Sequence, residues 1–116
     1  MRQYDKTHAV LVAAAVAVAA NRFIAYEGKY PSAGGGAHDS QGVSENAAQP
    51  GEDITVITGY SGVVEAAGAI AFGDPVISDA QGRAIVATTA EHCGVALGAA
   101  AAGQLVEVQI CKHIHA

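Results

Sequence analysis

The chain has few basic residues: six Lys and Arg stand against eleven Asp and Glu in 116 residues, for a formal net charge of −5. Residues 1–38 carry four basic and two acidic residues, a balance of +2. Residues 39–107 carry one basic and nine acidic residues, a balance of −8. A protein that binds nucleic acid needs clustered Lys and Arg to displace counterions from the phosphates. Because the sequence has no such cluster, it argues against a nucleic-acid partner.

Tryptophan is absent, and only six residues are aromatic. A surface that stacks bases presents several aromatic side chains together, whereas these are scattered along the chain. We therefore expect them to pack in a core or an interface. They are Tyr4, Phe23, Tyr26, Tyr30, Tyr60 and Phe72.

Cysteine occurs only twice, at Cys93 and Cys111. Two thiols do not make the disulfide framework of a small secreted domain, so we expect both to be reduced. His92 and Cys93 would point to opposite sides of a strand, the wrong arrangement for a thiolate–imidazole pair. The carboxylates fall at turns, where Asp usually bonds the local backbone. The sequence therefore indicates no catalytic residue, no cofactor and no enzyme.

No apolar run is long enough for a membrane helix, which needs about 20 residues. The longest run, residues 9–20, has twelve. It has some features of a signal peptide, because Arg2 and Lys6 precede it and Ala17-Val18-Ala19 ends it. We expect it instead to be part of the folded chain, which starts at Met1, and we predict no membrane partner.

The β-branched residues of this run recur with a period of two. Val10, Val12, Val16 and Val18 occupy even positions, while the odd positions hold Ala and one Leu. In a strand these valines share one face, whereas on a helix they would spread around the circumference. An Ala-rich buried helix is the alternative, since Ala is the best helix former. The alternation favours a long, bent strand and predicts that residues 1–20 form an apolar N-terminal strand or arm.

Two stretches, 42–58 and 94–110, align without a gap at a separation of 52 positions, and six of their seventeen pairs are identical. Each stretch predicts a turn of small residues that reaches a Gly and feeds an alternating strand. None of the shared residues can move a proton, bind a metal or attack a carbon, so what recurs is architecture. The identical pairs are Gly42/Gly94, Val43/Val95, Ala47/Ala99, Ala48/Ala100, Gly51/Gly103 and Val56/Val108.

The rest of the chain alternates short apolar segments with turn residues. Pro75 lacks a backbone donor and is expected at a strand start or an edge. Residues 78–82, between two apolar segments, predict a hairpin with Gly82 at the position that tolerates positive φ. The triplet at 34–36 indicates a loop, since no Gly-Lys-Ser/Thr ending makes it a phosphate-binding loop. The predicted class is all-β, with a small β-barrel or β-sandwich-like (β-clip-like) domain over residues 21–116.

The order of these pieces carries a family resemblance over residues 22–110. The chain reads G-V-(x)n-A-A-x-x-G-E-x-I-x-V from Gly42, G-V-V-x-A-x-G-A-I-x-x-G-D-x-V from Gly62, D-A-x-G-R-A from Asp79 and G-V-A-L-x-x-A-x-x-G-Q-x-V-x-V from Gly94. This order resembles the small capsid decoration, or cement, proteins of tailed bacteriophages, which are similar in role to lambda-type head decoration proteins. The resemblance implies a structural protein of the virion, made in the host bacterial cytoplasm and bound to the capsid exterior. It also implies the major capsid protein as partner and a homo-oligomer, with a trimer favoured.

Such a role gives the N-terminal segment a purpose, because an extended edge can add backbone hydrogen bonds to a neighbour. The alternative function is a small β-barrel binding module on the virion surface, for a carbohydrate or a peptide. The absence of Trp favours the decoration protein over the sugar-binding module. The interface candidates are Val10, Val12, Val16, Val18 and Arg22.

Three potential metal ligands alternate near the C-terminus. Cys111, His113 and His115 would lie on one face of a final strand, where thiolate and imidazole ligands suit Zn²⁺ or Cu²⁺. The other interpretation is a polar terminus with one buried thiol, which the composition favours. We therefore predict no metal site and keep these three residues as weak candidates.

Overall fold

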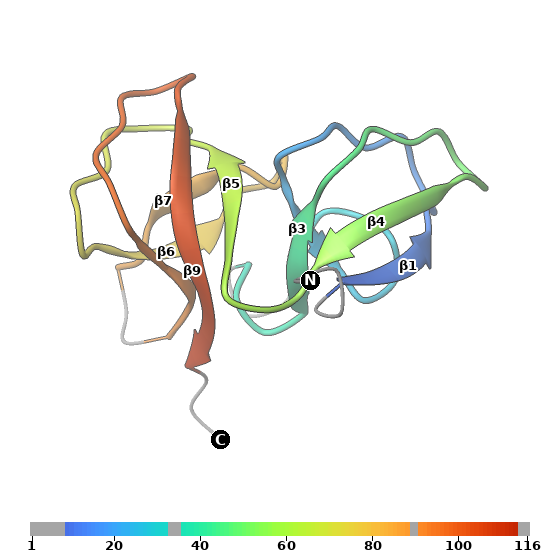
Figure 1. The fold of residues 1–116 in the computed structure, drawn as a ribbon, viewed down its shortest axis with the longest axis horizontal. Helices are drawn as coiled ribbons and strands as arrows, with labels where there is room; N and C mark the ends of the chain where they lie inside the picture. Colours follow the sequence, from blue (N-terminus) through green and yellow to red (C-terminus); the bar gives the residue numbers. More distant parts are fainter. Residues whose placement is uncertain (1–8, 33–35, 89–90, 114–116) are drawn as a thin grey trace, which may run out of the picture.

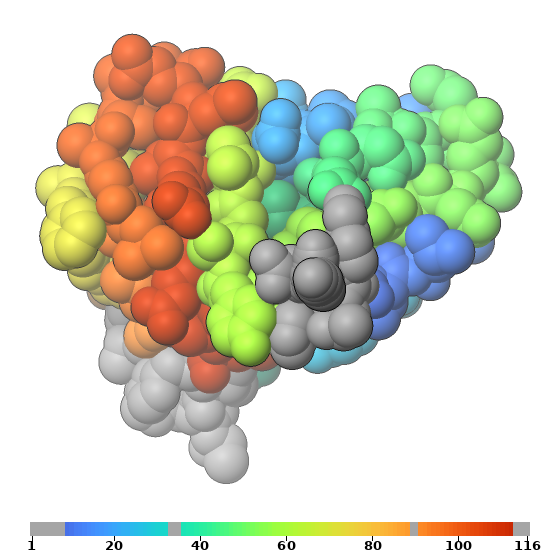
Figure 2. All heavy atoms as spheres, viewed as in Figure 1, coloured from blue at the N-terminus to red at the C-terminus, as the bar shows by residue number. Residues whose placement is uncertain are grey.

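The structure is a computed structural model that describes residues 9–32, 36–88 and 91–113, and within these ranges it contains nine β-strands and no helix. The strands form two antiparallel sheets, one from the N-terminal half (blue to green) and one from the C-terminal half (yellow-green to red) (Figure 1). In the space-filling view the two halves form two lobes that meet along residues 61–65 (Figure 2). The prediction of a small all-β domain of barrel or sandwich type is confirmed.

The first sheet has the strand order β1-β4-β3-β2, so β1 and β2 are its edges. Its alternation is clearest in β4, where Ile54 and Val56 are fully buried and Thr55 between them is half-buried. The apolar alternation predicted for this segment is thus present. The strands are β1 (Ala9–Ala13), β2 (Phe23–Ala25), β3 (Ser40–Ser44) and β4 (Asp53–Ile57).

The second sheet has the order β5-β9-β8-β6-β7. The predicted hairpin joins β6 to β7, Pro75 is the first residue of β6, and Gly82 in the turn has φ 77°. A bridge between Ala66 and Ala84 links the end of β5 to β7, so this sheet curls back on itself. The strands are β5 (Ser61–Glu65), β6 (Pro75–Ser78), β7 (Ala84–Val86), β8 (His92–Ala96) and β9 (Leu105–His113).

The two sheets are copies of one design at the same 52-residue separation. β1 pairs with β4 from Ala9↔Ile57 onward, and β5 pairs with β9 from Ser61↔Gln109 onward, in the same register. The isolated bridges repeat as well, with Val18↔Ala48 matching Ile70↔Ala100. The duplication therefore covers residues 9–57 and 61–109, well beyond the two stretches 42–58 and 94–110 whose sequences reveal it.

At two of the shared residue pairs, the backbone explains why both repeats have Gly. Gly51 and Gly103 adopt φ values of 89° and 85°, where a side chain is strained. Gly42 and Gly94 have ordinary φ but lie against the neighbouring strand, so a Cβ on Gly42 would overlap the carbonyl oxygen of Ile57. The glycines that recur in the sequence are thus required by turn geometry and by close strand approach.

The N-terminal run is a strand only over its first part. β1 ends at Ala13, where the chain bends because Ala14 N–H donates to the Glu52 carbonyl and Ala15 N–H donates to the Gly28 carbonyl. The predicted long strand is therefore shorter than expected. Since the alternation stops, the four valines do not share one face: Val10 and Val16 are exposed, Val12 is half-buried and Val18 is 5% exposed.

Two apolar clusters hold the fold, and the second draws on both sheets. The smaller cluster includes Ala14, Val18 and Ile54 of the first repeat. The larger cluster lies in the second sheet and also takes in Phe23 and Val43 from β2 and β3. Ala14 and Val18 of the N-terminal segment thus pack against the first sheet, and the larger cluster joins the two lobes. The division into an arm of residues 1–20 and a body stays a prediction.

Candidate functional site

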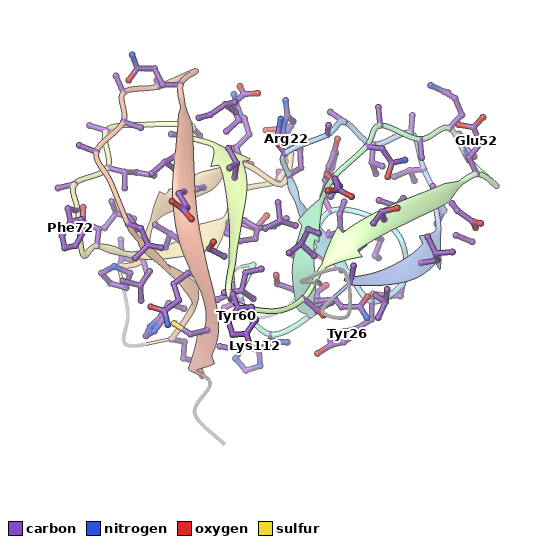
Figure 3. The ribbon with its side chains drawn as sticks, viewed as in Figure 1. Arg22, Tyr26, Glu52, Tyr60, Phe72 and Lys112 are labelled. Atoms are coloured by element: carbon purple, nitrogen blue, oxygen red, sulfur yellow. The ribbon has the colours of Figure 1, made fainter. Side chains whose placement is uncertain are left out.

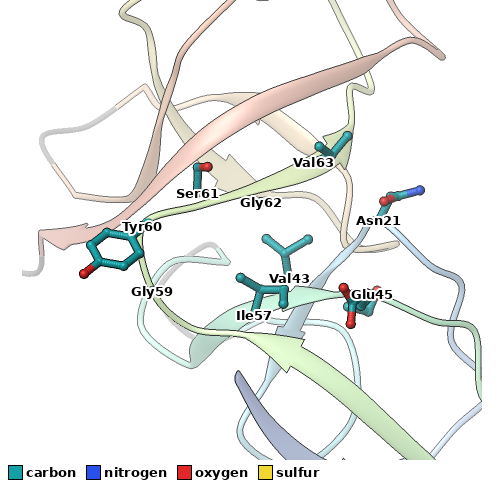
Figure 4. A pocket seen from close by; sticks show the side chains of 10 residues that line it. Asn21, Val43, Glu45, Ile57, Gly59, Tyr60, Ser61, Gly62 and Val63 are labelled. Carbon is teal, nitrogen blue, oxygen red and sulfur yellow. The ribbon is translucent and has the colours of Figure 1, made fainter. Parts of the chain in front are cut away.

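A groove of about 390 Å³ runs between the two sheets (Figure 4). One wall comes from β3 and β4 and the other from the start of β5, and the lining is mostly apolar with Glu45 at one end. Its lining residues are Asn21, Val43, Ser44, Glu45, Ile57, Gly59, Tyr60, Ser61, Gly62 and Val63.

Two lining residues adopt positive φ without being glycine: Asn21 at 61° and Tyr60 at 59°. Asn21 has a structural reason, because its repeat counterpart Gly73 also has positive φ, at 86°. Tyr60 is a bulky residue in this region, which is uncommon, and its side chain is 69% exposed. No described residue in the groove is arranged for chemistry.

Arg22, one of the predicted interface residues, lies at the junction of the two lobes. Its guanidinium forms an ion pair with Glu65 at 2.9 Å and donates to the Gln81 carbonyl at 2.9 Å. The adjacent backbone also crosses the junction, since Phe23 N–H donates to the Gly82 carbonyl. Arg22 is 18% exposed and its charge is neutralised within the chain. Its contact with a partner stays a prediction, and its observed contacts join the two repeats.

The valine candidates are separated by the bend after β1. Val10 and Val16 are 39% and 43% exposed, whereas Val18 is buried in the first core. β1 itself is an edge strand without a charged residue, and its Leu11 is 68% exposed. Natural proteins usually protect such an edge with charge, so an unprotected apolar edge is typical of a docking strand. The structure thus keeps Val10 accessible and adds Leu11, which the valine pattern missed.

The weak metal candidates are only partly described. Cys111 lies in β9 and is half-buried, and burial raises the pKa of its thiol. His113 ends β9, but its side chain lies outside the described part of the chain, as does all of His115. Among the residues that the structure describes, no group of three His, Cys, Asp or Glu is placed to hold a metal ion. The three-residue cluster stays an open candidate.

Cys93 is a buried thiol whose surroundings oppose nucleophilic chemistry. Its side chain is 3% exposed, and its sulfur lies 3.8 Å from the carbonyl oxygens of Gly36 and Val76. Burial raises the pKa of Cys93 to about 11 from an ordinary value of 9.0. The thiol is therefore neutral at physiological pH, where a thiolate would be the reactive form.

Because this thiol is buried, we predict that the free energy of unfolding falls at alkaline pH. The unfolded chain releases the Cys93 proton near pH 9, whereas the folded chain holds it to about pH 11. The free energy of unfolding is unaffected by titration of this thiol below pH 9 and falls as the pH rises from 9 to 11, by about 3 kcal/mol in all. Urea unfolding of the parent protein and of Cys93→Ala from pH 8 to 11 measures it. We expect the free energy of unfolding to fall more steeply with pH in the parent than in Cys93→Ala. An equal fall in both proteins would contradict the raised pKa of Cys93.

The acidic side chains at turns serve the backbone, as predicted. Asp79 accepts hydrogen bonds from the N–H groups of Gln81 and Arg83, and Asp74 accepts one from Ala71 N–H. These carboxylates hold turns and do not form a catalytic pair. Elsewhere, the ammonium of Lys112 in β9 lies 4.8 Å from the ring centre of the exposed Tyr26, which follows β2, and donates a hydrogen bond to the Tyr26 hydroxyl (Figure 3).

One exposed apolar surface went unnoticed in the sequence. Phe72, Leu97 and Leu105 are 73%, 37% and 55% exposed, and all three belong to the loop end of the second repeat. For Leu97 and Leu105 the available signal was the stretch from residue 92 to 106, which contains no Asp, Glu, Lys or Arg. Within a chain so rich in Ala and Gly, that stretch predicted only a turn and the strand that follows it. In the described ranges, no helix is long and apolar enough to cross a membrane.

The described residues thus form a duplicated all-β body with an apolar edge at β1 and an apolar loop end in the second repeat. The family model for the phage cement protein matches residues 2–110, nearly the whole chain, so the chain belongs to this family. The resemblance drawn from the sequence is thereby confirmed.

A solved structure shares the fold. It is the head fiber gp8.5 N base of bacteriophage phi29, with a TM-score of 0.67 and 20% sequence identity, covering 92% of this chain and 98% of that chain. At this identity the likeness supports the fold. A search of curated proteins finds no match.

Proposed function

We propose that this protein is a capsid decoration protein that binds the outside of a phage head and stabilises its shell. The match of the cement protein family to residues 2–110 carries this proposal. The contact is with the major capsid protein, and the protein acts as a homo-oligomer, with a trimer favoured. It is made in the host bacterial cytoplasm and joins the head from there.

The edge of β1 is the docking strand in this proposal. β1 pairs with β4 on one side, and its other side is an edge of the sheet. Val10 and Leu11 are exposed on it, so an extended capsid segment gains both backbone hydrogen bonds and apolar contact there. Many copies on one shell then act together, so each single contact needs only modest strength.

Heads that lack the protein provide the test. Purified protein is added back, occupancy is counted by negative-stain microscopy, and survival of the heads is measured after heating. We expect decorated heads to survive a temperature that opens bare heads, because each bound copy stabilises the assembled state over the dissociated one. A surface binding module for carbohydrate or peptide would leave survival unchanged at full occupancy. That result, or absence of the protein from mature virions, would contradict the proposal.

A further inference from the structure

The loop end of the second repeat is an exposed surface without charge, which we name the apolar tip. It consists of residues 66–73 and 97–105, two stretches joined by the Ile70↔Ala100 bridge and by hydrogen bonds between Ala66 and residues 103 and 104. Neither stretch contains Asp, Glu, Lys or Arg. Its exposed apolar residues are Ala69, Ala71, Phe72, Leu97, Ala99, Ala101, Ala102 and Leu105.

The first repeat builds the same loop end with different side chains. This acidic tip consists of residues 14–21 and 45–53, and its backbone repeats the hydrogen bonds of the apolar tip at the 52-residue separation. Even a side-chain bond is conserved: Glu52 accepts from Gln49 N–H at 2.8 Å, and Gln104 accepts from Ala101 N–H at 2.8 Å. In the second repeat a neutral amide thus replaces a carboxylate without loss of the bond.

Three exposed positions change toward larger apolar side chains in the second repeat, while one, Val16 in the acidic tip against Gly68 in the apolar tip, changes the other way. Leu97 stands where the first repeat has Glu45, Leu105 where it has Asp53, and Phe72 where it has Ala20. The matching backbone shows that this loop end folds with carboxylates and Ala at these positions. The apolar side chains are therefore not needed by the fold, although exposing them to water is unfavourable. A surface that the fold does not need, and that water disfavours, is typical of a contact surface.

We infer that the apolar tip is the surface through which copies of this protein associate, so that the tips of neighbouring copies meet; the inference rests on the homo-oligomer of the proposed function. Charge selects this partner. Residues 39–107 carry a balance of −8, so two copies repel one another wherever their carboxylates meet. The acidic tip contains three carboxylates, Glu45, Glu52 and Asp53, whereas the apolar tip contains none and is bordered by one, that of Asp74, which accepts a hydrogen bond from Ala71 N–H. Apposed apolar tips thus allow the closest approach of two acidic copies with the least repulsion.

The composition of the tip also favours a permanent contact between copies. Interfaces of homo-oligomers resemble a protein core, whereas interfaces that form later between soluble partners carry more polar groups. The tip contains Ala, Gly, Leu, Ile and Phe with one polar residue, Gln104, whose amide oxygen accepts a hydrogen bond from Ala101 N–H. The nearest carboxylate on β9 is Glu107, which accepts a hydrogen bond from Ser61. A like tip from a second copy covers this surface before the protein meets a head.

The first repeat supplies the test variants. Leu97→Glu, Leu105→Asp and Phe72→Ala together place the side chains of the acidic tip on the apolar tip, in positions where the same backbone already accepts them. Sedimentation velocity over a concentration series is expected to show an oligomer for the parent protein and an 11.6 kDa monomer for the triple variant. Loss of three exposed apolar contacts is expected to weaken self-association on the order of a hundredfold or more.

The matched control is Tyr60→Asn, which removes an equally exposed aromatic residue outside the tip and keeps a residue that tolerates positive φ. We expect this variant to remain an oligomer. A monomeric parent, an unchanged triple variant, or equal loss in the control would each overturn the inference. If circular dichroism shows that the triple variant is unfolded, the single variant Leu105→Asp is tested by sedimentation velocity in its place, with loss of the oligomer as the expected result.

Cross-linking locates the contact independently. In a Cys111→Ser background, Ala101→Cys in the apolar tip is compared with Gln49→Cys at the equivalent place in the acidic tip, using a short bis-maleimide. We expect cross-linked dimers for Ala101→Cys only; dimers for Gln49→Cys alone would overturn the inference. Both experiments use purified protein without heads, so their failure is distinct from failure of head binding. If the triple variant stays oligomeric but no longer binds heads, the tip is a capsid contact and the inference is wrong.

Discussion

Replacing Gly42 by Ala is expected to destabilise the fold by about 3 kcal/mol, a large share of the total stability of a small domain. A Cβ at this position overlaps the carbonyl oxygen of Ile57 and lies 2.9 Å from Cγ1 of Val56. The obstacle is backbone in the adjacent strand, so β3 and β4 must separate to admit one methyl group. Thermal unfolding is expected to show a midpoint lower by roughly 10–20 °C.

The same strand position in the second repeat allows a graded comparison. At Gly94 the added Cβ overlaps Cγ1 of Val108, while the nearest carbonyl oxygen, that of Gln109, is 3.1 Å away. A side chain can shift more easily than a backbone, so Gly94→Ala is expected to lower the free energy of unfolding by less than Gly42→Ala does. The control is Gly98→Ala, because no atom of the chain lies within 4 Å of a Cβ there and its φ is not positive. Since Gly98 lies in the apolar tip, the variants are compared at a protein concentration low enough for the monomer. We expect Gly98→Ala to stay within about 0.5 kcal/mol of the parent. Equal melting points for all three would contradict the packing at β3 and β8.

These glycines show why part of the fold can be predicted from the sequence. Close strand approach at Gly42 and positive φ at Gly51 admit no other residue easily, so both were retained in the second copy of the repeat. The buried Val56 and its counterpart Val108 are fixed by the same packing. Residues under such strict constraints keep their identity, and their alignment predicted two similar strand-turn units.

The first half of each repeat was not predictable in this way. There the repeat aligns Val10 with Gly62, and Ala13 with Glu65, although the strands have the same register. The matches that remain are mostly Ala, which carry little information in a chain with 26 of them. An exposed or half-buried position in a strand requires only a side chain that fits a pleated surface, so many residue types are tolerated there. For the same reason, the alternation of valines did not reveal that β1 ends at Ala13.

Local chemistry was predictable at the hairpin, and long-range contacts were not. Pro75, Asp79 and Gly82 act on their own turn, and each lies where its backbone chemistry indicates. Arg22 instead finds Glu65 and Gln81, residues distant in the sequence, and a single sequence gives no signal for this pairing. The exposed Phe72 and Leu105 were likewise invisible, because exposure depends on the arrangement of two loops that only the fold brings together.

Replacing Leu11 by Lys is expected to abolish decoration of heads while leaving the protein folded. Leu11 is 68% exposed in the edge strand β1, so an ammonium group there stays in water and the melting midpoint is expected to change little. Natural sheets use Lys on edge strands to prevent addition of another strand. Loss of each single contact is multiplied over the many copies on one shell, so occupancy falls steeply. Negative-stain microscopy and co-sedimentation with heads measure the occupancy.

The duplication provides the matched control for this variant. Val63 occupies the place of Leu11 in the second repeat, in the edge strand β5, and is 42% exposed beside the groove between the sheets. Val63→Lys introduces the same charge on an equivalent strand, and we expect it to decorate heads as the parent does. If Leu11→Lys binds at full occupancy, β1 is not the docking edge. If only Val63→Lys loses binding, the capsid segment lies against β5, and the docking strand belongs to the second repeat.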